Sequence, residues 1–183
     1  MNELSVAEVA KGHVLLGFFY DLIEVFVSAL IVVAIIFTFF FRTAGVDGES
    51  MNDTLQNEDR LIMYNFWYTP ARGDIVIVNR YHDGDTTIAK PLIKRVIGVA
   101  GDTVKVTEDT VYLNGEPLDE PYVHYPNSPS EIEVTVPEGQ VFVMGDHRNA
   151  SNDSRSLGCF DNEDIMGKAL WRIFPSEDFG TVY

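Results

Sequence analysis

Two patterns of apolar and polar residues divide the chain. From Val25 to Phe41 the sequence runs for 17 residues without a charge, whereas after residue 60 short apolar runs alternate with turn residues. A helix of 17 residues is about 25 Å long, and adding residues 22–24 gives the length that crosses the hydrocarbon core of a bilayer. The first pattern therefore predicts a transmembrane helix over residues 22–41.

Two other interpretations of the apolar run fit less well. The run is not amphipathic and its length suits hydrocarbon, which argues against a buried core helix. It is too long for a typical signal-peptide core, and Arg42 follows it without a small-x-small cleavage site. Residues 1–21 are either an interfacial helix or an extension of the anchor. Lys11 before the run and Arg42 after it give almost no charge bias, so charge alone does not orient the helix.

The second pattern predicts a mostly antiparallel β domain over residues 45–183, so the expected fold class is mainly β with one N-terminal transmembrane helix. Asn114 and Gly115 form an Asn-Gly signal, which predicts a β-hairpin extension. Residues 119–130 contain three prolines and predict a surface loop, and a short turn is expected at 162–165. The strands are expected at 61–65, 74–79, 87–99, 102–107, 110–118, 133–136, 140–146 and 168–174.

The composition excludes several classes of function. Lys and Arg number 13 against 28 Asp and Glu, a formal net charge of −15, which argues against nucleic acid as a partner because phosphate binding needs basic patches. The single cysteine, Cys159, cannot form an internal disulfide or a Cys-rich zinc site, and the four histidines lack metal-ligand spacing. We expect no metal and no cofactor, and we interpret Cys159 as a small buried residue.

Ser50 and Lys94 are the first candidate catalytic residues. Ser50 lies in the turn-rich stretch GESMNDTLQNED, just after the anchor. Lys94 lies in an otherwise apolar strand, where alternation places it on the face of Leu92 and Val96 and directs Arg95 to the other face. Burial favours the neutral amine, which can take a proton from a serine hydroxyl. An edge lysine with its amine in water explains this stretch equally well.

A third candidate region is the polar loop after the expected strand 140–146. The segment VFVMGDHRNASNDSRSLG combines charged pairs with short hydrogen-bonding groups. Asp153 and Arg155 are expected to form an ion pair that orders the loop, and Ser151 to exchange a hydrogen bond with a nearby amine. In isolation, the segment is also consistent with a solvated turn rich in Ser, Asn and Asp.

Taken together, these stretches resemble the bacterial type I signal peptidases, the membrane-bound Ser-Lys endopeptidases that remove signal peptides. The resemblance rests on four motifs in order behind one N-terminal span, and it reaches from the anchor to about Trp171. The motifs are SMxxTL from Ser50, RGDIVIV at 72–78, KRVIGVAGD at 94–102 and GDHRNASNDSR at 145–155. The resemblance implies cleavage of secreted preproteins after small-x-small sites such as Ala-x-Ala.

The resemblance also implies roles for individual residues. Ser50 is expected as the nucleophile, with its backbone N–H in the oxyanion hole, and Lys94 as the general base. Ser151 is expected to hold and orient the amine of Lys94. The other supporting positions are Asp153 and Arg155, expected to brace the site, Met51, expected to line the substrate cleft, and Gly48 and Asp146.

Four positions depart from the family pattern. Asp53 and Ala100 replace common prolines, and His147 replaces the usual asparagine of GDNR. Gly48 stands where some members have a serine whose hydroxyl donates to the oxyanion, so a second donor has to come from another group. None of these changes removes a catalytic group.

The resemblance further implies an N-terminus in the cytosol and a catalytic domain outside the cytoplasmic membrane. The expected partners are preprotein signal peptides and the phospholipid bilayer, with the secretion translocon nearby. Ser50 is nine residues beyond Phe41, so its tether spans at most about 30 Å and keeps the serine close to the bilayer. The aromatic cluster YNFWY at 64–68 either lies at the headgroups or belongs to the core.

Two other functions share part of this pattern. A Ser-Lys autoprotease of the SOS-repressor kind would lack an anchor and carry an Ala-Gly cleavage site beside a DNA-binding domain, whereas the pair Ala44-Gly45 lies here between anchor and domain. A membrane-tethered β binding module would have no need for Ser50 and Lys94, and it would not cleave peptides.

Overall fold

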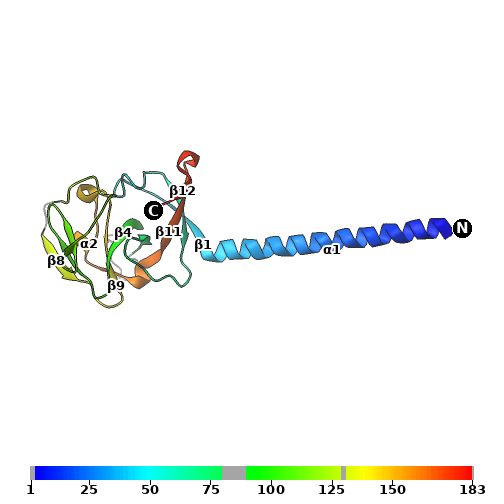
Figure 1. Cartoon of the computed structure of the whole chain (residues 1–183), viewed down its shortest axis with the longest axis horizontal. Helices are drawn as coiled ribbons and strands as arrows, with labels where there is room; N and C mark the ends of the chain where they lie inside the picture. Colours follow the sequence, from blue (N-terminus) through cyan, green and yellow to red (C-terminus); the bar gives the residue numbers. More distant parts are fainter. Residues whose placement is uncertain (1–2, 80–89, 129–130, 183) are drawn as a thin grey trace. The chain divides into compact units, whose positions relative to one another are not determined.

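The computed structural model describes residues 3–79, 90–128 and 131–182, and it divides into two compact units (Figure 1). The first unit ends at Phe40 and the second begins at Phe41. The β domain thus begins at residue 41 rather than at the expected residue 45, because residues 41–45 already form a strand of its sheet.

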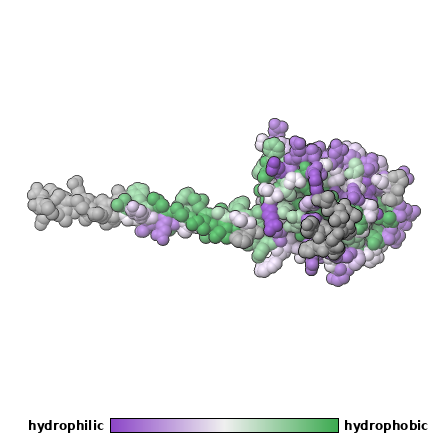
Figure 2. All heavy atoms as spheres, turned by 180° about the vertical axis from the view of Figure 1, so that it is seen from behind, coloured by the Kyte–Doolittle hydropathy of each residue, from purple (hydrophilic) through white to green (hydrophobic). Residues whose placement is uncertain are grey.

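The first unit is the helix α1, Glu3–Phe40. Among the described residues, one segment is long and apolar enough to cross a membrane, Leu16–Thr38, and Figure 2 shows apolar surface along it. The hydroxyls of Ser28 and Thr38 donate to backbone carbonyls about one turn earlier, which satisfies both polar groups inside the helix. Because the helix begins at residue 3, the N-terminal segment extends the anchor helix and does not form a separate element.

In the described part of the chain, the second unit contains one antiparallel sheet of eight strands and one of four. The larger sheet has the order β1-β2-β11-β3-β4-β9-β10, with β12 paired to β11. Its strands are β1 (Phe41–Gly45), β2 (Arg60–Tyr64), β3 (Ile75–Val78), β4 (Leu92–Val99), β9 (Gln140–Met144), β10 (Phe160–Asp161), β11 (Ile165–Phe174) and β12 (Gly180–Thr181).

The smaller sheet carries the predicted hairpin. Its order is β7-β6-β5-β8, with the bounds Glu116–Pro117, Val111–Leu113, Thr103–Val106 and Ile132–Thr135. The chain reverses between β6 and β7 at Asn114 and Gly115, whose φ angles of 55° and 88° are both positive. These are the angles that a two-residue hairpin turn requires, so the Asn-Gly prediction is confirmed.

Several short elements had no usable sequence signal. The helix α2 (Ser154–Leu157) and the edge strands β1, β10 and β12 were not predicted, because each is short and is stabilised by neighbours distant in sequence. The turn expected at 162–165 is the 3₁₀ helix η2, Asn162–Asp164. Two further 3₁₀ helices are η1 (Arg148–Ala150) and η3 (Ser176–Asp178). Of the strand expected at 87–99, residues 87–89 lie outside the described residues.

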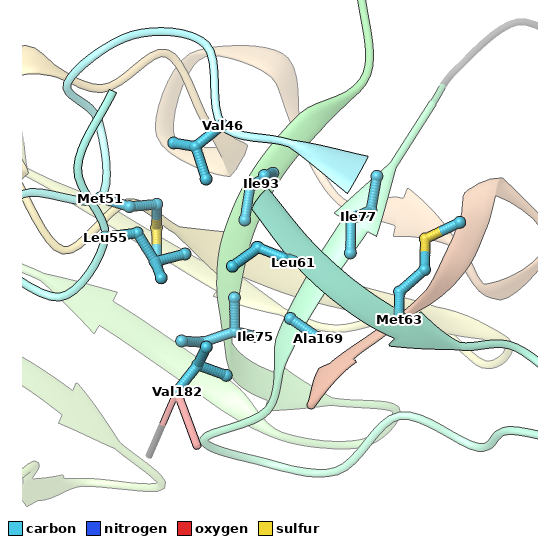
Figure 3. Packing of buried hydrophobic residues seen from close by; sticks show 10 residues of the cluster. All are labelled: Val46, Met51, Leu55, Leu61, Met63, Ile75, Ile77, Ile93, Ala169 and Val182. Atoms are coloured by element: carbon cyan, nitrogen blue, oxygen red, sulfur yellow. The ribbon is translucent and has the colours of Figure 1, made fainter. Parts of the chain in front are cut away.

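One core cluster packs the turn that contains Ser50 onto the larger sheet (Figure 3). Met51 and Leu55 from this turn lie among buried apolar side chains of β2, β3, β4 and β11. Burying one such side chain contributes about 1.5–3 kcal/mol, so the core holds the turn against the strand that carries Lys94.

Candidate active site

Ser50 lies half-buried in the connection between β1 and β2. Gly48 adopts φ +103°, a conformation that side chains make costly, and its N–H donates to the amide oxygen of Asn57 at 2.8 Å. Glycine adopts this backbone conformation without the cost that a side chain would add. Gly48 therefore supports the turn through its main chain and brings no hydroxyl to the site.

Met51 lies in the core, and its expected place in the substrate cleft stays a prediction. Only 1% of its surface is exposed, and its side chain packs in the core beside Leu55 (Figure 3). A flexible apolar side chain is more stable in this core than at a polar turn surface, which accounts for its burial.

Lys94 projects from β4 into the interior, as the apolar strand pattern predicted. It is 2% exposed, which contradicts the alternative of an amine in water. Its Nζ donates to the hydroxyl of Ser50 at 2.7 Å and to the carbonyl of Ile93 at 2.9 Å. The Ser50 hydroxyl and the Lys94 amine are therefore in direct contact, which is the geometry that proton transfer between them requires.

The surroundings of Lys94 favour its neutral form. Loss of hydration is the largest cause and lowers the pKa of Lys94 to about 8. The negative charges of Asp153 and Asp146 oppose this effect, whereas the positive charge of Arg155 adds to it. An amine with this pKa is deprotonated in a substantial fraction of molecules just above neutral pH.

Asp146 joins three parts of the site. Its buried carboxylate accepts two hydrogen bonds from Arg95, at 2.9 and 2.6 Å, and one from the hydroxyl of Thr54, at 2.6 Å. The guanidinium of Arg95 also lies 3.9 Å from the ring centre of Tyr122. A two-point pair of this kind is directional, so it fixes β4 and the Ser50 turn to the loop after β9.

The expected ion pair between Asp153 and Arg155 is present. Arg155 donates to both carboxylate oxygens at 2.8 Å, and Asp153 also accepts from the Gly145 N–H and caps α2. Burial would raise the pKa of Asp153, but the hydrogen bond and charge of Arg155, with the bond from Ser151, hold it below its ordinary value. Asp153 is therefore a buried anion that orders the loop.

Ser151 contacts this brace rather than Lys94. Its hydroxyl donates to Asp153 at 2.6 Å, and among the described residues the Lys94 amine bonds only to Ser50 and Ile93. With its single proton given to Asp153, the Ser151 oxygen keeps its lone pairs as acceptors. The orientation of the Lys94 amine by Ser151 stays a prediction.

A buried ion pair that no sequence pattern indicated lies beside the same loop. Arg148 is 1% exposed, and it donates to both carboxylate oxygens of Glu120 and to the carbonyl of Gly145. Asn127 is buried as well, so the segment expected to be a surface loop packs partly inward. The partners are 28 residues apart in sequence, and local patterns do not report such pairings.

Two of the motifs contribute structure more than chemistry. Arg72 of RGDIVIV donates to both carboxylate oxygens of Asp102, the last residue of KRVIGVAGD. Asp74 accepts from Lys168 at 2.6 Å and from the hydroxyl of Tyr68 at 2.6 Å. The Asp74–Lys168 pair links the start of β3 to β11. The Arg72–Asp102 pair links the segment before β3 to the turn between β4 and β5.

A cavity of about 310 Å³ is lined in part by residues that are neighbours of Ser50 and Lys94 in the chain. Its lining includes Ile93, whose carbonyl accepts from Lys94, and Asp47, three residues before Ser50. Asp47 forms an ion pair with Lys90 at this cavity. The remaining lining residues are Thr43, Ala44, Gly45, Met63, Ile77, Pro91 and Met166.

The matching family model and the sequence relatives are all signal peptidases. The family model described as "Signal peptidase, peptidase S26" matches residues 19–174. A probable signal peptidase I-1 from Synechocystis sp. is 36% identical over 173 residues, covering 89% of this chain and 86% of the relative. Signal peptidase I from Bacillus licheniformis is 35% identical over 170 residues, covering 85% of this chain and 89% of the relative. A crystal structure of a signal peptidase I from Enterococcus faecalis V583 matches with 31% identity and a TM-score of 0.46, covering 55% of this chain and 97% of that chain.

Proposed function

The chain belongs to the signal peptidase family, peptidase S26, and is a membrane serine peptidase that acts on signal peptides; we propose that Ser50 and Lys94 carry out its chemistry. The observation that supports this assignment most directly is the 2.7 Å contact between the Lys94 amine and the Ser50 hydroxyl. A binding module has no use for a buried lysine against a serine, and keeping it there costs hydration of the amine.

The proposed reaction has two halves. Neutral Lys94 takes the hydroxyl proton of Ser50 while the serine oxygen attacks the carbonyl carbon of the scissile peptide bond. The ammonium of Lys94 then donates this proton to the leaving amine as the peptide bond breaks, which leaves an ester on Ser50. Lys94 next takes a proton from water, the hydroxide attacks the ester, and the proton returns to the Ser50 oxygen.

The backbone N–H of Ser50 is the proposed donor to the oxyanion. Among the described residues this N–H has no hydrogen-bond partner, so no internal bond has to break when the substrate carbonyl becomes negative. Gly48 has no hydroxyl, so it cannot supply a second donor from its side chain.

The proposed substrates are preproteins cut after small-x-small sequences. The cavity lined by Asp47 and Ile93 is mostly apolar and would receive residues that precede the cut. Peptides with Leu or Phe one or three residues before the cut are expected to be cleaved poorly, and equal turnover of Ala and Phe at the residue before the cut would contradict this specificity.

The proposed topology places the N-terminus in the cytosol and the β domain outside the cytoplasmic membrane, near the secretion translocon. Leu16–Thr38, which suits a single span, supports the membrane anchor, whereas the proposed orientation follows from the membership of the signal peptidase family. A cysteine-free variant with single cysteines added at residues 2 and 116 tests it in intact cells: only position 116 should react with a membrane-impermeant thiol reagent.

The deciding experiment compares four full-length proteins on one Ala-x-Ala signal peptide. Wild type and Cys159→Ala should cleave it at the predicted bond, whereas Ser50→Ala and Lys94→Ala should be inactive while remaining folded. Wild-type rates in Ser50→Ala would refute the assignment. An autoprotease would instead cut itself at Ala44-Gly45, a bond that lies inside β1 and is paired with β2.

A further inference from the structure

We propose that His147 is a positioning residue that orients the N–H of Ser50 toward the oxyanion. This inference rests on the proposed role of Ser50. The imidazole Nδ1 of His147 is 3.1 Å from the carbonyl oxygen of Glu49, and the His147 N–H donates to the carbonyl of Ser50 at 3.1 Å. His147 thus holds both peptide groups that flank the Cα atom of the nucleophile.

The first of these contacts controls the oxyanion donor. The Glu49 carbonyl and the Ser50 N–H belong to one peptide group, which is trans, so they point in opposite directions. A hydrogen bond that fixes the carbonyl of Glu49 therefore fixes the direction of the Ser50 N–H. The Asn52 N–H donates to the same carbonyl at 3.0 Å, so this oxygen is held by two donors.

The contact also assigns the proton on the imidazole. A backbone carbonyl only accepts hydrogen bonds, so Nδ1 must carry a proton for the pair to form. Phenylalanine at this position would keep a ring of similar size without the donor. Asparagine would keep an N–H donor without the ring.

A second element holds the imidazole in place. The ring of His147 stacks on Tyr125, with centroids 3.8 Å apart and planes 25° from parallel. The segment that carries Tyr125 is fixed at both sides, because Arg148 bonds to Glu120 and to Asn127. The buried Arg148–Glu120 pair thereby supports the oxyanion donor through Tyr125 and His147.

The expected effect is on the chemical step. Removing one oxyanion donor costs about 100- to 1,000-fold in kcat, and a misdirected donor costs less. We therefore expect His147→Phe to lower kcat by roughly 10- to 100-fold, with KM within about twofold of wild type.

The experiment measures kcat and KM of full-length variants on the Ala-x-Ala peptide. Asn and Leu have the same branching, so His147→Asn and His147→Leu form a matched pair that differs in the donor. His147→Asn should keep kcat within a few-fold of wild type, whereas His147→Leu and His147→Phe should both show the lower kcat expected without the donor. His124→Phe, at an exposed histidine of the same domain, is the control and should be unchanged.

Two further measurements separate positioning from general damage. A peptide aldehyde, which forms an oxyanion on Ser50, should bind His147→Phe more weakly in proportion to the loss of kcat/KM. The same peptide with a reduced, uncleavable scissile bond should bind all folded variants equally. Wild-type kcat in His147→Phe, or equal losses in the Asn and Leu variants, would overturn the role of His147. Activity in Ser50→Ala would instead refute the proposed function itself.

Discussion

The amine of Lys94 and the hydroxyl of Ser50 are 2.7 Å apart although 44 residues separate them in the chain. The contact forms because β4 carries Lys94 into the interior and the packing of Met51 and Leu55 holds the serine turn on the same sheet. Burial of the amine lowers its pKa to about 8, so the position of Lys94 sets both the geometry and the protonation state of the proposed base.

The rate of the enzyme should rise with pH through the ionisation of Lys94. Below its pKa the amine carries a proton and cannot accept another from Ser50, so kcat/KM should fall at acid pH, with a limb near pH 8. The measurement is kcat/KM between pH 6 and pH 10 on a peptide that does not titrate. If Lys94→Arg kept substantial activity and its acid limb lay at the same pH as in the wild type, the base would be another group.

Replacing Asp153 by asparagine should move this limb to lower pH. The negative charge of Asp153 raises the pKa of Lys94, and the substitution would remove that charge while leaving Arg155 positive. The positive charge of Arg155 would then act on the amine without the opposing carboxylate, which favours the neutral form. Asp161→Asn, at an exposed position, serves as the control and should leave the limb unchanged. An upward shift in Asp153→Asn would contradict the electrostatic role assigned to this carboxylate.

Much of this arrangement could be predicted because it is encoded locally. The apolar run, the strand alternation around Lys94 and the Asn-Gly turn depend on residues close in sequence, and the Asp153–Arg155 pair spans two positions. The burial of Met51 and the Arg148–Glu120 pair could not be predicted in this way. Both depend on which elements pack together in three dimensions, and a single sequence does not report that directly.

Lys94→Met should stabilise the folded protein at neutral pH. The pKa of this lysine is near its ordinary value of 10.5 in the unfolded chain and about 8 in the fold. Between pH 8 and pH 10.5 the unfolded state binds more protons than the folded state, so the stability of the wild type rises with pH. Below pH 8 the burial of the charged amine costs roughly 3 kcal/mol.

Denaturant unfolding of the wild type and Lys94→Met at pH 7 and at pH 10 checks this sign. The advantage of Lys94→Met should be largest at pH 7 and should shrink at pH 10. Lys105→Met, at a half-buried lysine of the smaller sheet, is the comparison and should show little change with pH. An advantage that grew with pH would contradict the lowered pKa of Lys94.

Trp67 should contact lipid in proteoliposomes. It is 91% exposed, which excludes a core position for this member of the aromatic cluster. It follows β2, whose last residue, Tyr64, pairs with Phe41, the first residue after α1. Amphipathic rings favour the headgroup region. Brominated lipids should therefore quench the fluorescence of Trp171→Phe, which retains Trp67, and absence of quenching would place Trp67 in water.

Gly145→Ala should impair cleavage while leaving the fold largely intact. A Cβ atom at Gly145 would overlap the Ser50 carbonyl oxygen and the Ser151 hydroxyl oxygen, and it would lie 2.6 Å from the Cβ atom of Ser151. These approaches are closer than any stable contact, so the serine turn or the loop after β9 has to move. The Ser50 carbonyl is one of the groups that this Cβ would meet, so a shift of the serine turn would displace the proposed nucleophile from Lys94.

A displacement of this kind is costly to catalysis, since misplacing a reacting group by about 1 Å can lower the rate by about 100-fold. We expect kcat/KM of Gly145→Ala to fall at least about tenfold on the Ala-x-Ala peptide. Gly180→Ala is the matched control, because a Cβ there meets no atom within 4 Å, and it should retain full activity. Wild-type activity in Gly145→Ala would mean that the loop after β9 does not hold Ser50 in its reactive position.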